Sequence, residues 1–166
     1  MPYPEALVAP MRAELTRLGL TELKDAASVD AAFAIEDGQT MLLVVNSVCG
    51  CAAANARPAV ALAMQNATLP DRSVTVFAGQ DLEATAQARL HLAGIAPSSP
   101  FIALFKDGDP VFVLERRNIE GRSASAIATD LVNACNSFCG NGPSPTKTAE
   151  AQPDASDVPS TFRSIL

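Results

Sequence analysis

Two cysteines separated by a single glycine, Cys49 and Cys51, are the residues of this sequence best suited to chemistry. They follow an apolar run, residues 40–46, and precede a stretch of helix-forming residues. Close cysteine pairs bind zinc, form structural disulfides or act as thiol nucleophiles. The surroundings of the pair must separate these three uses.

The expected position of Cys49 favours thiol catalysis. It should lie where a buried strand meets a helix N-terminus, and the unpaired N–H groups and helix dipole there favour a negative charge. A thiolate so placed has a lowered pKa, and the thiolate is the nucleophile. Gly50 relaxes the backbone enough to permit a strained Cys49–Cys51 disulfide. Strained disulfides exchange readily, so the pair suits thiol–disulfide exchange or isomerisation.

The elements that must position this pair alternate along the chain. In chain order we expect helices over 4–18 and 28–38, a strand over 40–46, a helix over 52–67, a strand over 73–79, a helix over 82–94, strands over 101–105 and 110–115, and a helix over 120–140. Ser28 and Asp81 are the expected N-caps of their helices. Pro58 should kink the helix that contains it.

This order predicts an α/β fold: a thioredoxin-like βαβ–ββα sandwich with a central mixed sheet and added N-terminal helices. Residues 1–140 are expected to form the domain, with 1–38 as its N-terminal helical extension, and 141–166 a flexible tail rich in Pro, Ser and Ala. In thioredoxin-like proteins a cis-proline opens the strand that faces the active site. Pro100 is the candidate, and Ser99 would offer backbone groups to an incoming peptide.

Composition narrows the function classes. Of the 166 residues, 48% are hydrophobic and 18% charged, which is enough to build a core, and the net charge of -6 argues against a nucleic-acid partner. No apolar run reaches the roughly 18–20 residues of a membrane span, and the N-terminus lacks the pattern of a signal peptide. The expected compartment is the cytoplasm, where cysteines stay reduced and a structural disulfide is disfavoured.

Five stretches carry a resemblance to a known family: "LVAPMRAELTRLG", "VVNSVCGCAAANARPA", "VTVFAGQDLEATAQAR", "APSSP" and "IEGR". They resemble the bacilliredoxins, thioredoxin-like proteins with a Cys-Gly-Cys active site. The resemblance implies that the protein removes bacillithiol from S-thiolated proteins, with weak disulfide isomerase or reductase activity. Cys49 would attack the mixed disulfide and take up the bacillithiol, and Cys51 would be the other active-site thiol. Gly50, Ser99 and Pro100 would contact the substrate.

The partners that follow are S-thiolated client proteins and a small-thiol reductant system, with room for a homodimer. No cofactor is expected beyond a low-molecular-weight thiol as co-substrate, for which glutathione or cysteine can stand in place of bacillithiol. No metal is expected at the site.

The alternative is a non-catalytic zinc-binding or redox-sensing module that uses all four cysteines, because Cys135 and Cys139 share a helix face. Their spacing is not the usual pair of two-residue knuckles. Taken singly, Cys135 is expected to be a buried hydrophobe, whereas Cys139 is expected to be more exposed and is a candidate resolving thiol.

Three further residue groups have weaker functional interpretations. His91, the single histidine, is expected at a helix end on the surface, not beside Cys49. Arg57 either supports the thiolate electrostatically or is a surface residue whose stem covers apolar area. The mixed-charge stretch 115–122 is expected to be solvated, although one of its arginines could hold the carboxylates of a small thiol.

Overall fold

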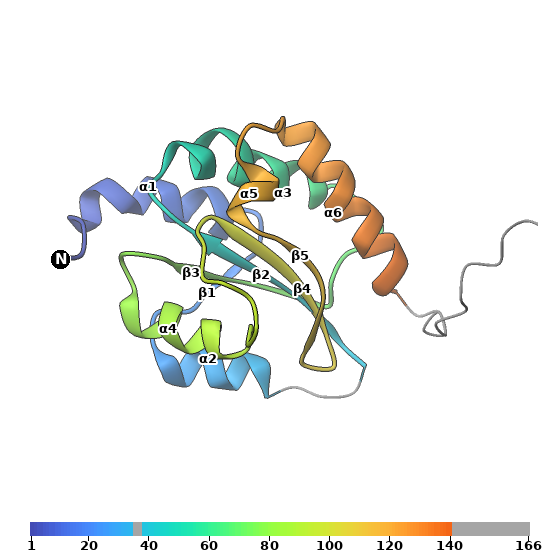
Figure 1. The fold of residues 1–166 in the computed structure, drawn as a ribbon, viewed down its shortest axis with the longest axis horizontal. Helices are drawn as coiled ribbons and strands as arrows, with labels where there is room; N and C mark the ends of the chain where they lie inside the picture. The colour runs from blue at the N-terminus through green and yellow to red at the C-terminus, as the bar shows by residue number, and fades with distance from the viewer. Residues whose placement is uncertain (35–37, 141–166) are drawn as a thin grey trace, which may run out of the picture.

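The computed structural model describes residues 1–34 and 38–140, and the predicted tail lies outside this range. Its centre is a five-stranded mixed sheet in the order β1-β3-β2-β4-β5 (Figure 1). The strands are β1 (Thr21–Glu22), β2 (Thr40–Asn46), β3 (Arg72–Phe77), β4 (Phe101–Lys106) and β5 (Asp109–Leu114). β1 and β2 pair parallel to β3, whereas β4 pairs antiparallel to both β2 and β5. This is the predicted thioredoxin-like α/β arrangement.

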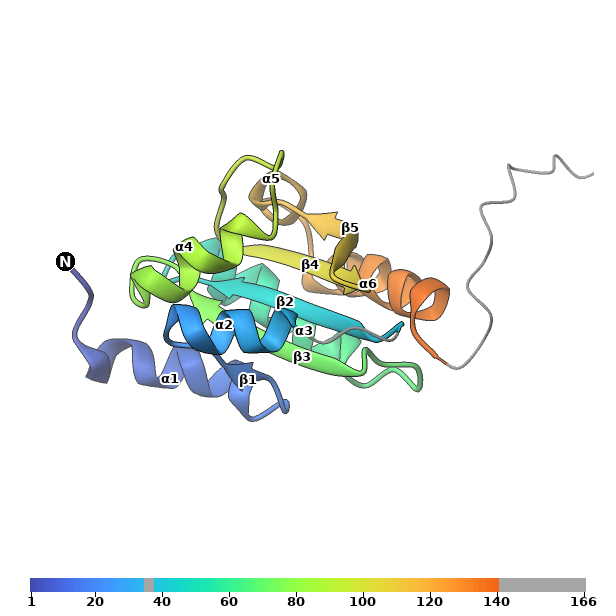
Figure 2. The ribbon, with the colours of Figure 1, turned by 90° about the horizontal axis from the view of Figure 1, so that it is seen from below.

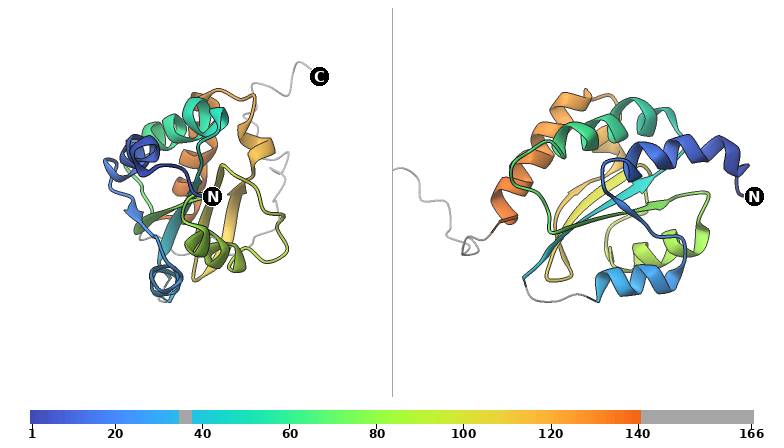
Figure 3. Two further views of the ribbon diagram at one scale, coloured as in Figure 1. Left: turned by 90° about the vertical axis from the view of Figure 1, so that its left-hand side faces the viewer. Right: turned by 180° about the vertical axis from the view of Figure 1, so that it is seen from behind.

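Helices cover both faces of the sheet, as Figures 1 and 3 show. They are α1 (Glu5–Thr16), α2 (Ala26–Phe33), the π-helical turn η1 (Ala52–Ala56), α3 (Arg57–Ala63), α4 (Leu82–Leu90), α5 (Arg116–Ile119) and α6 (Ala124–Phe138). The pair α2 and α4 packs on one face, and α1, α3 and α6 pack on the other. Over residues 1–34 and 38–140, no helix combines the length and apolar character needed to span a bilayer.

The central strand β2 is buried along its whole length, which explains its continuous apolar sequence. Because side chains alternate along a strand, Leu43 and Val45 enter the core under α2 and α4, and Leu42 and Val44 enter the core under α3 and α6. Burial on two faces fixes the register of β2. The end of this strand, where the cysteine pair follows, is therefore firmly positioned.

The N-terminal segment contributes to the sheet itself. The two-residue strand β1, which the sequence pattern did not predict, pairs with Val74 and Thr75 of β3. The helix that follows, α2, is capped by Asp25 and not by Ser28. Ser28 is the third helical residue: its N–H donates to the Asp25 carboxylate, and its hydroxyl accepts the Asp25 N–H. The helix ends at Phe33, short of the predicted residue 38, and residues 35–37 lie outside the described residues.

Pro58 changes the helix in a way that differs from the predicted simple kink. The turn before it widens into η1, in which the Arg57 N–H bonds to the carbonyl of Ala52, five residues earlier. A proline ring clashes with the carbonyl four residues before it and donates no hydrogen bond, and a wider turn relieves both problems. Such π-turns often occur at functional sites, and this one begins directly after Cys51.

Arg12 is a buried charged residue that ties α1 to the rest of the domain. Its guanidinium, 7% exposed, forms ion pairs with Glu5 at 2.8 Å, with Glu22 at 2.6 Å and with Asp81 at 2.6 Å. The Asp81 side chain is thus engaged with Arg12 and does not cap α4, although Asp81 is the N-cap residue. The prediction that Asp81 caps the helix with its side chain is therefore wrong, because its partner Arg12 lies 69 residues away along the chain.

The helix predicted over 120–140 is α6, which begins later, at Ala124, and a separate short helix over 116–119 was not predicted. A short α5 precedes a turn at Gly121, which adopts a left-handed φ of 76°, and α6 then begins after Ser123. The Ser123 hydroxyl accepts the Ala126 N–H at 3.2 Å and so caps α6. Arg116 of α5 lies beside Cys51.

Candidate active site

Cys49 lies at the junction between β2 and the helix that follows it. Its carbonyl accepts the N–H groups of Ala52 at 3.1 Å and Ala53 at 3.2 Å, so Cys49 is the first residue of the helical turn and Cys51 lies within that turn. Both side chains are partly exposed and carry free thiols. This is the position that the sequence predicted, at the end of a fully buried strand.

Hydrogen bonds stabilise the thiolate form of Cys49. The Ser47 hydroxyl donates to Cys49 Sγ at 3.1 Å and also accepts the Cys49 N–H at 3.4 Å. Burial alone would raise the pKa of Cys49, but hydrogen bonds from Ser47, from the Ala52 N–H and from Cys51 outweigh it and lower that pKa below the ordinary value. Cys49 is therefore the more acidic thiol of the pair and the better nucleophile at neutral pH.

Cys51 has the opposite character. Burial, the neighbouring Cys49 charge and the hydrogen bond that Cys51 gives to Cys49 together raise the pKa of Cys51. Arg116 partly opposes this effect, because its Nη2 lies 3.7 Å from Cys51 Sγ. The pair is thus polarised: the pKa of Cys49 lies below the ordinary cysteine value and the pKa of Cys51 lies above it.

Arg57 holds the turn that presents Cys49. Its Nη1 donates to Asn46 Oδ1 and to the Ser47 carbonyl, each at 3.0 Å, and its Nε pairs with Glu14 at 2.6 Å. The Asn46 amide oxygen also accepts the Ser47 N–H at 2.9 Å. Arg57 is 3% exposed, so its interpretation as a surface residue is wrong. It contacts the turn and not the cysteine sulfurs.

The predicted substrate-contact residues lie at the same edge of the sheet as Cys49. The Ser99–Pro100 peptide bond is cis, as expected. Val45 pairs with Phe101, so Pro100 lies next to the end of β2. At Gly50 an added Cβ would meet nothing within 4 Å, which leaves open space in front of the helix start.

The second cysteine pair lies at the other end of β2. Cys139 is buried against Leu104, and a hydrogen bond with Thr40, the first residue of β2, helps to lower its pKa. Cys49, in contrast, comes after the last residue of β2. Seven residues of strand separate the two ends by roughly 20 Å. Within one chain, Cys139 therefore does not reach Cys49 as a resolving thiol, and its predicted exposure is wrong.

Cys135 and Cys139 nevertheless interact with each other. A hydrogen bond from Cys135 lowers the pKa of Cys139 to about 7, against the opposing effect of burial. The same hydrogen bond, together with burial, raises the pKa of Cys135 far above its ordinary value. Cys135 is buried, as predicted.

The positions of the four cysteines and of His91 disfavour a zinc site and a Cys–His pair. Four sulfurs split between opposite ends of a strand do not converge on one zinc ion, and among the described residues no cluster of three metal-ligating side chains occurs. His91 stacks on Phe33 with ring centroids 3.9 Å apart. Phe33 in turn packs on Phe105, which pairs with Met41 near the start of β2, so His91 is remote from Cys49.

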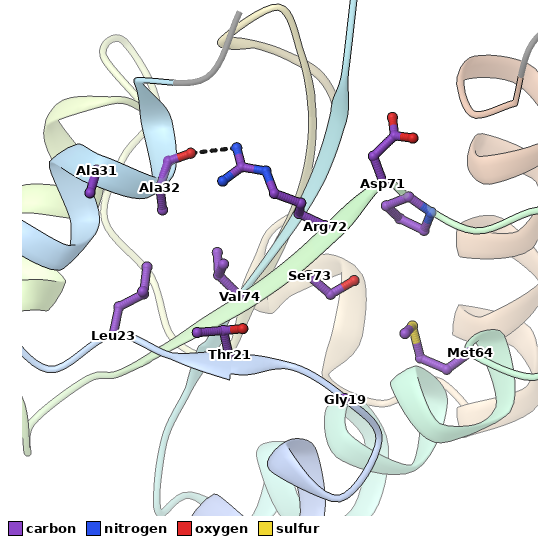
Figure 4. Close-up of a pocket in the computed structure, with 11 residues that line it drawn as sticks. Gly19, Thr21, Leu23, Ala31, Ala32, Met64, Asp71, Arg72, Ser73 and Val74 are labelled. Atoms are coloured by element: carbon purple, nitrogen blue, oxygen red, sulfur yellow. Dashed lines mark hydrogen bonds between the residues drawn. The ribbon is translucent and has the colours of Figure 1, made fainter.

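A cavity of about 540 Å³ lies along the outer edge of β3, between β1 and the ends of α2 and α3 (Figure 4). Arg72 and Ser73 in its wall pair with the first half of β2, at the end away from Cys49. In Figure 4 the Arg72 guanidinium points away from β3 and donates to the Ala32 carbonyl. This cavity is not part of the cysteine site.

Ser47→Ala tests how the thiolate is stabilised. Removal of the hydroxyl donor should raise the pKa of Cys49, so a smaller fraction is thiolate at pH 7 and alkylation of Cys49 slows severalfold. The measurement is the pH profile of iodoacetamide reaction at Cys49, resolved by peptide mass spectrometry. Ser137→Ala, on the exposed side of α6, should leave the profile unchanged. An unshifted profile in Ser47→Ala contradicts this account.

Comparison with known proteins agrees with this site. Residues 3–139 match the model of a family described as disulphide isomerase. Two proteins of Salinibacter ruber named bacilliredoxin are 59% and 54% identical to this chain, with 99% of each chain covered in both comparisons. A bacilliredoxin of Koribacter versatilis is 48% identical over 83% of this chain and 94% of its own. These names support a role of the thiol–disulfide oxidoreductase kind. The chain belongs to the bacilliredoxin family.

Proposed function

We propose that this protein removes bacillithiol, or another small thiol, from S-thiolated proteins, with weak disulfide isomerase or reductase activity. The observation that carries the proposal is the polarised pair: a partly exposed Cys49 whose pKa is lowered, beside Cys51, whose pKa is raised. A nucleophile of low pKa next to a second thiol is the arrangement that thiol–disulfide exchange requires.

The reaction proceeds by two sulfur exchanges. The Cys49 thiolate attacks the small-thiol sulfur of the mixed disulfide, a Cys49–small-thiol disulfide forms, and the client leaves as a thiolate that takes up a proton. Cys51, once deprotonated, attacks Cys49 Sγ, releases the small thiol and closes the Cys49–Cys51 disulfide. Alternatively, a second small thiol attacks the sulfur of the small thiol bound to Cys49, which forms a disulfide of two small thiols and regenerates the Cys49 thiolate. In both cases, the electrons move only between sulfurs and no resident cofactor is needed.

The substrate would approach past the open space at Gly50 and meet the backbone at Ser99 and Pro100, which share the sheet edge with Cys49. The partners in this proposal are S-thiolated client proteins and a small-thiol system that returns the pair to its reduced state. Such a system belongs in the cytoplasm, which is the proposed location.

Trapping of the first intermediate tests the function. A Cys51→Ser variant should accumulate a bacillithiol adduct on Cys49 when mixed with a bacillithiolated client protein, because the internal exit is blocked. The reaction is quenched with an alkylating agent and measured by intact mass and by peptide mapping. A parallel reaction with a glutathionylated client shows whether the small thiol is exchangeable.

Cys49→Ala/Cys51→Ser is the matched control and should gain no adduct. If Cys49 stays unmodified while the client keeps its bacillithiol and its glutathione, the proposed function is wrong. Adduct formation at Cys139 in place of Cys49 would also overturn it, because the nucleophile would then lie at the opposite end of β2.

A further inference from the structure

A cavity of about 440 Å³ is lined in part by Arg116, the residue whose guanidinium contacts Cys51. One wall is the segment 96–98 that leads to Pro100, and the other is formed by Glu115, Arg116, Arg117 and Glu120. Figure 2 shows the chain before β4 running beside α5. The Arg116 N–H donates to Ser98 Oγ at 3.2 Å and joins the two walls, while its Nη2 lies 3.7 Å from Cys51 Sγ. The volume is in the range of small-molecule sites and is far too small for a folded client.

The charged lining of this cavity is balanced. Two guanidiniums, of Arg116 and Arg117, face two carboxylates, of Glu115 and Glu120. Arg117 Nε lies 2.6 Å from Glu115, and Arg116 Nε lies 3.4 Å from Glu120. Arg117 is 82% exposed and Glu120 59% exposed, so both side chains are free to turn toward a ligand.

This balance discriminates between classes of ligand. A thiol that carries only negative charge is attracted by the guanidiniums and repelled by the carboxylates, and a purely cationic thiol meets the reverse. A zwitterion that carries both a carboxylate and an ammonium pairs with both kinds of side chain. Guanidiniums bind carboxylates through paired, charge-assisted hydrogen bonds, and carboxylates accept equally from an ammonium.

We propose that this cavity is the subsite for the small-thiol half of the mixed disulfide, and that it selects a zwitterionic aminothiol, whose carboxylate binds at Arg116 and Arg117 and whose ammonium binds at Glu120. The proposal rests on the proposed function and adds the class of thiol. The subsite takes part in no bond-making step. The subsite holds the small thiol so that the sulfur of that thiol reaches Cys49. Cys49 is hydrogen-bonded to Cys51, the cysteine that Arg116 contacts.

A series of substrates that differ only in the charge of the thiol tests the proposal. One single-cysteine peptide is converted to its mixed disulfides with cysteine (zwitterion), cysteamine (cation), 3-mercaptopropionate (anion) and 2-mercaptoethanol (neutral). With the reduced intact protein in excess, kcat/KM for peptide release is measured in a single turnover, so no reductant is needed. The cysteine form should exceed each of the other three by about tenfold or more, the effect of one or two charge-assisted hydrogen bonds.

Two variants assign the preference to its residues. Arg117→Gln should reduce the advantage of the cysteine form over the cysteamine form, which lacks the carboxylate. Glu120→Gln should reduce its advantage over the mercaptopropionate form, which lacks the ammonium. Both changes should appear mainly in KM, since neither residue touches the reacting sulfurs. The controls Arg17→Gln and Asp109→Asn alter exposed charges away from the cavity and should change neither ratio.

The outcomes separate the two proposals. If none of the four forms is processed, the proposed function itself fails. If all four are processed at rates within twofold of each other, exchange stands and the subsite is overturned. A zwitterion preference that persists unchanged in both Arg117→Gln and Glu120→Gln also overturns the subsite, because another part of the protein must then carry the selection.

Discussion

Cys49→Ser is expected to reduce the rate of client dethiolation by at least about a thousandfold. A serine hydroxyl ionises far above the pH at which Cys49 is a thiolate, so the hydrogen bonds from Ser47 and Ala52 have no anion to stabilise near neutral pH. The measurement is release of the small thiol from an S-thiolated client under single-turnover conditions.

Cys51→Ser should behave differently at the first step. Because the pKa of Cys51 is raised and its role begins after the mixed disulfide has formed, loss of this thiol should leave the transfer to Cys49 within a few-fold of the normal rate. What should disappear is the second step, the release of small thiol by internal closure. Equal loss of the first step in Cys49→Ser and Cys51→Ser would contradict the division of roles between the two sulfurs.

The second cysteine pair supplies a matched control. Cys135→Ala/Cys139→Ala removes two thiols at the opposite end of β2 and should leave the dethiolation rate within about twofold. A large loss of rate in this variant, with the fold retained, would mean that Cys139 acts in the reaction despite its distance from Cys49 within one chain.

Long apolar runs made most of the fold predictable from the sequence. Residues 40–46 are buried on both faces and read as a continuous strand, and the hairpin of β4 and β5 follows from its turn residues. The strand β1 and the helix α5 are too short, at two and four residues, to show a periodicity. β1 depends on pairing with β3, and α5 depends on the burial of Ile119 in the core under α3 and α6, and no local pattern indicates either.

The site was predictable where local position determines chemistry. Cys49 lies between a strand and a helix start in any fold with this element order, so its acidity could be inferred. The burial or contacts of charged residues were not predicted where their partners lie far away along the chain. Arg57 was not recognised as buried because its partners, Glu14 and the turn at Asn46, lie 43 and 11 residues away along the chain. The contact of Arg116 with Cys51 spans 65 residues.

Arg57→Met is the change with the largest expected effect on stability among those that spare the cysteines. The methionine fills much of the same volume but removes the hydrogen bonds that Arg57 donates to Asn46 Oδ1, the Ser47 carbonyl and Glu14. Ser47 is buried, so its carbonyl loses a partner without gaining water. The free energy of unfolding should fall by roughly 2–4 kcal/mol, measured by urea denaturation.

The same variant should also change the chemistry of Cys49. Arg57 holds the turn in which Ser47 donates to the thiolate, so a looser turn weakens that hydrogen bond and the pKa of Cys49 should rise toward the ordinary cysteine value. The alkylation profile of Cys49 then moves to higher pH, which a purely structural role for Arg57 would not produce.

Glu14→Gln separates the contributions, because it weakens only the half-exposed ion pair and leaves the bonds to Asn46 and Ser47 in place. It should cost less than about 1 kcal/mol and leave the alkylation profile unmoved. If Arg57→Met lowers stability but the profile stays where it is, Ser47 is positioned by the strand end alone, and Arg57 serves only to attach α1 and α3 to that end of the sheet.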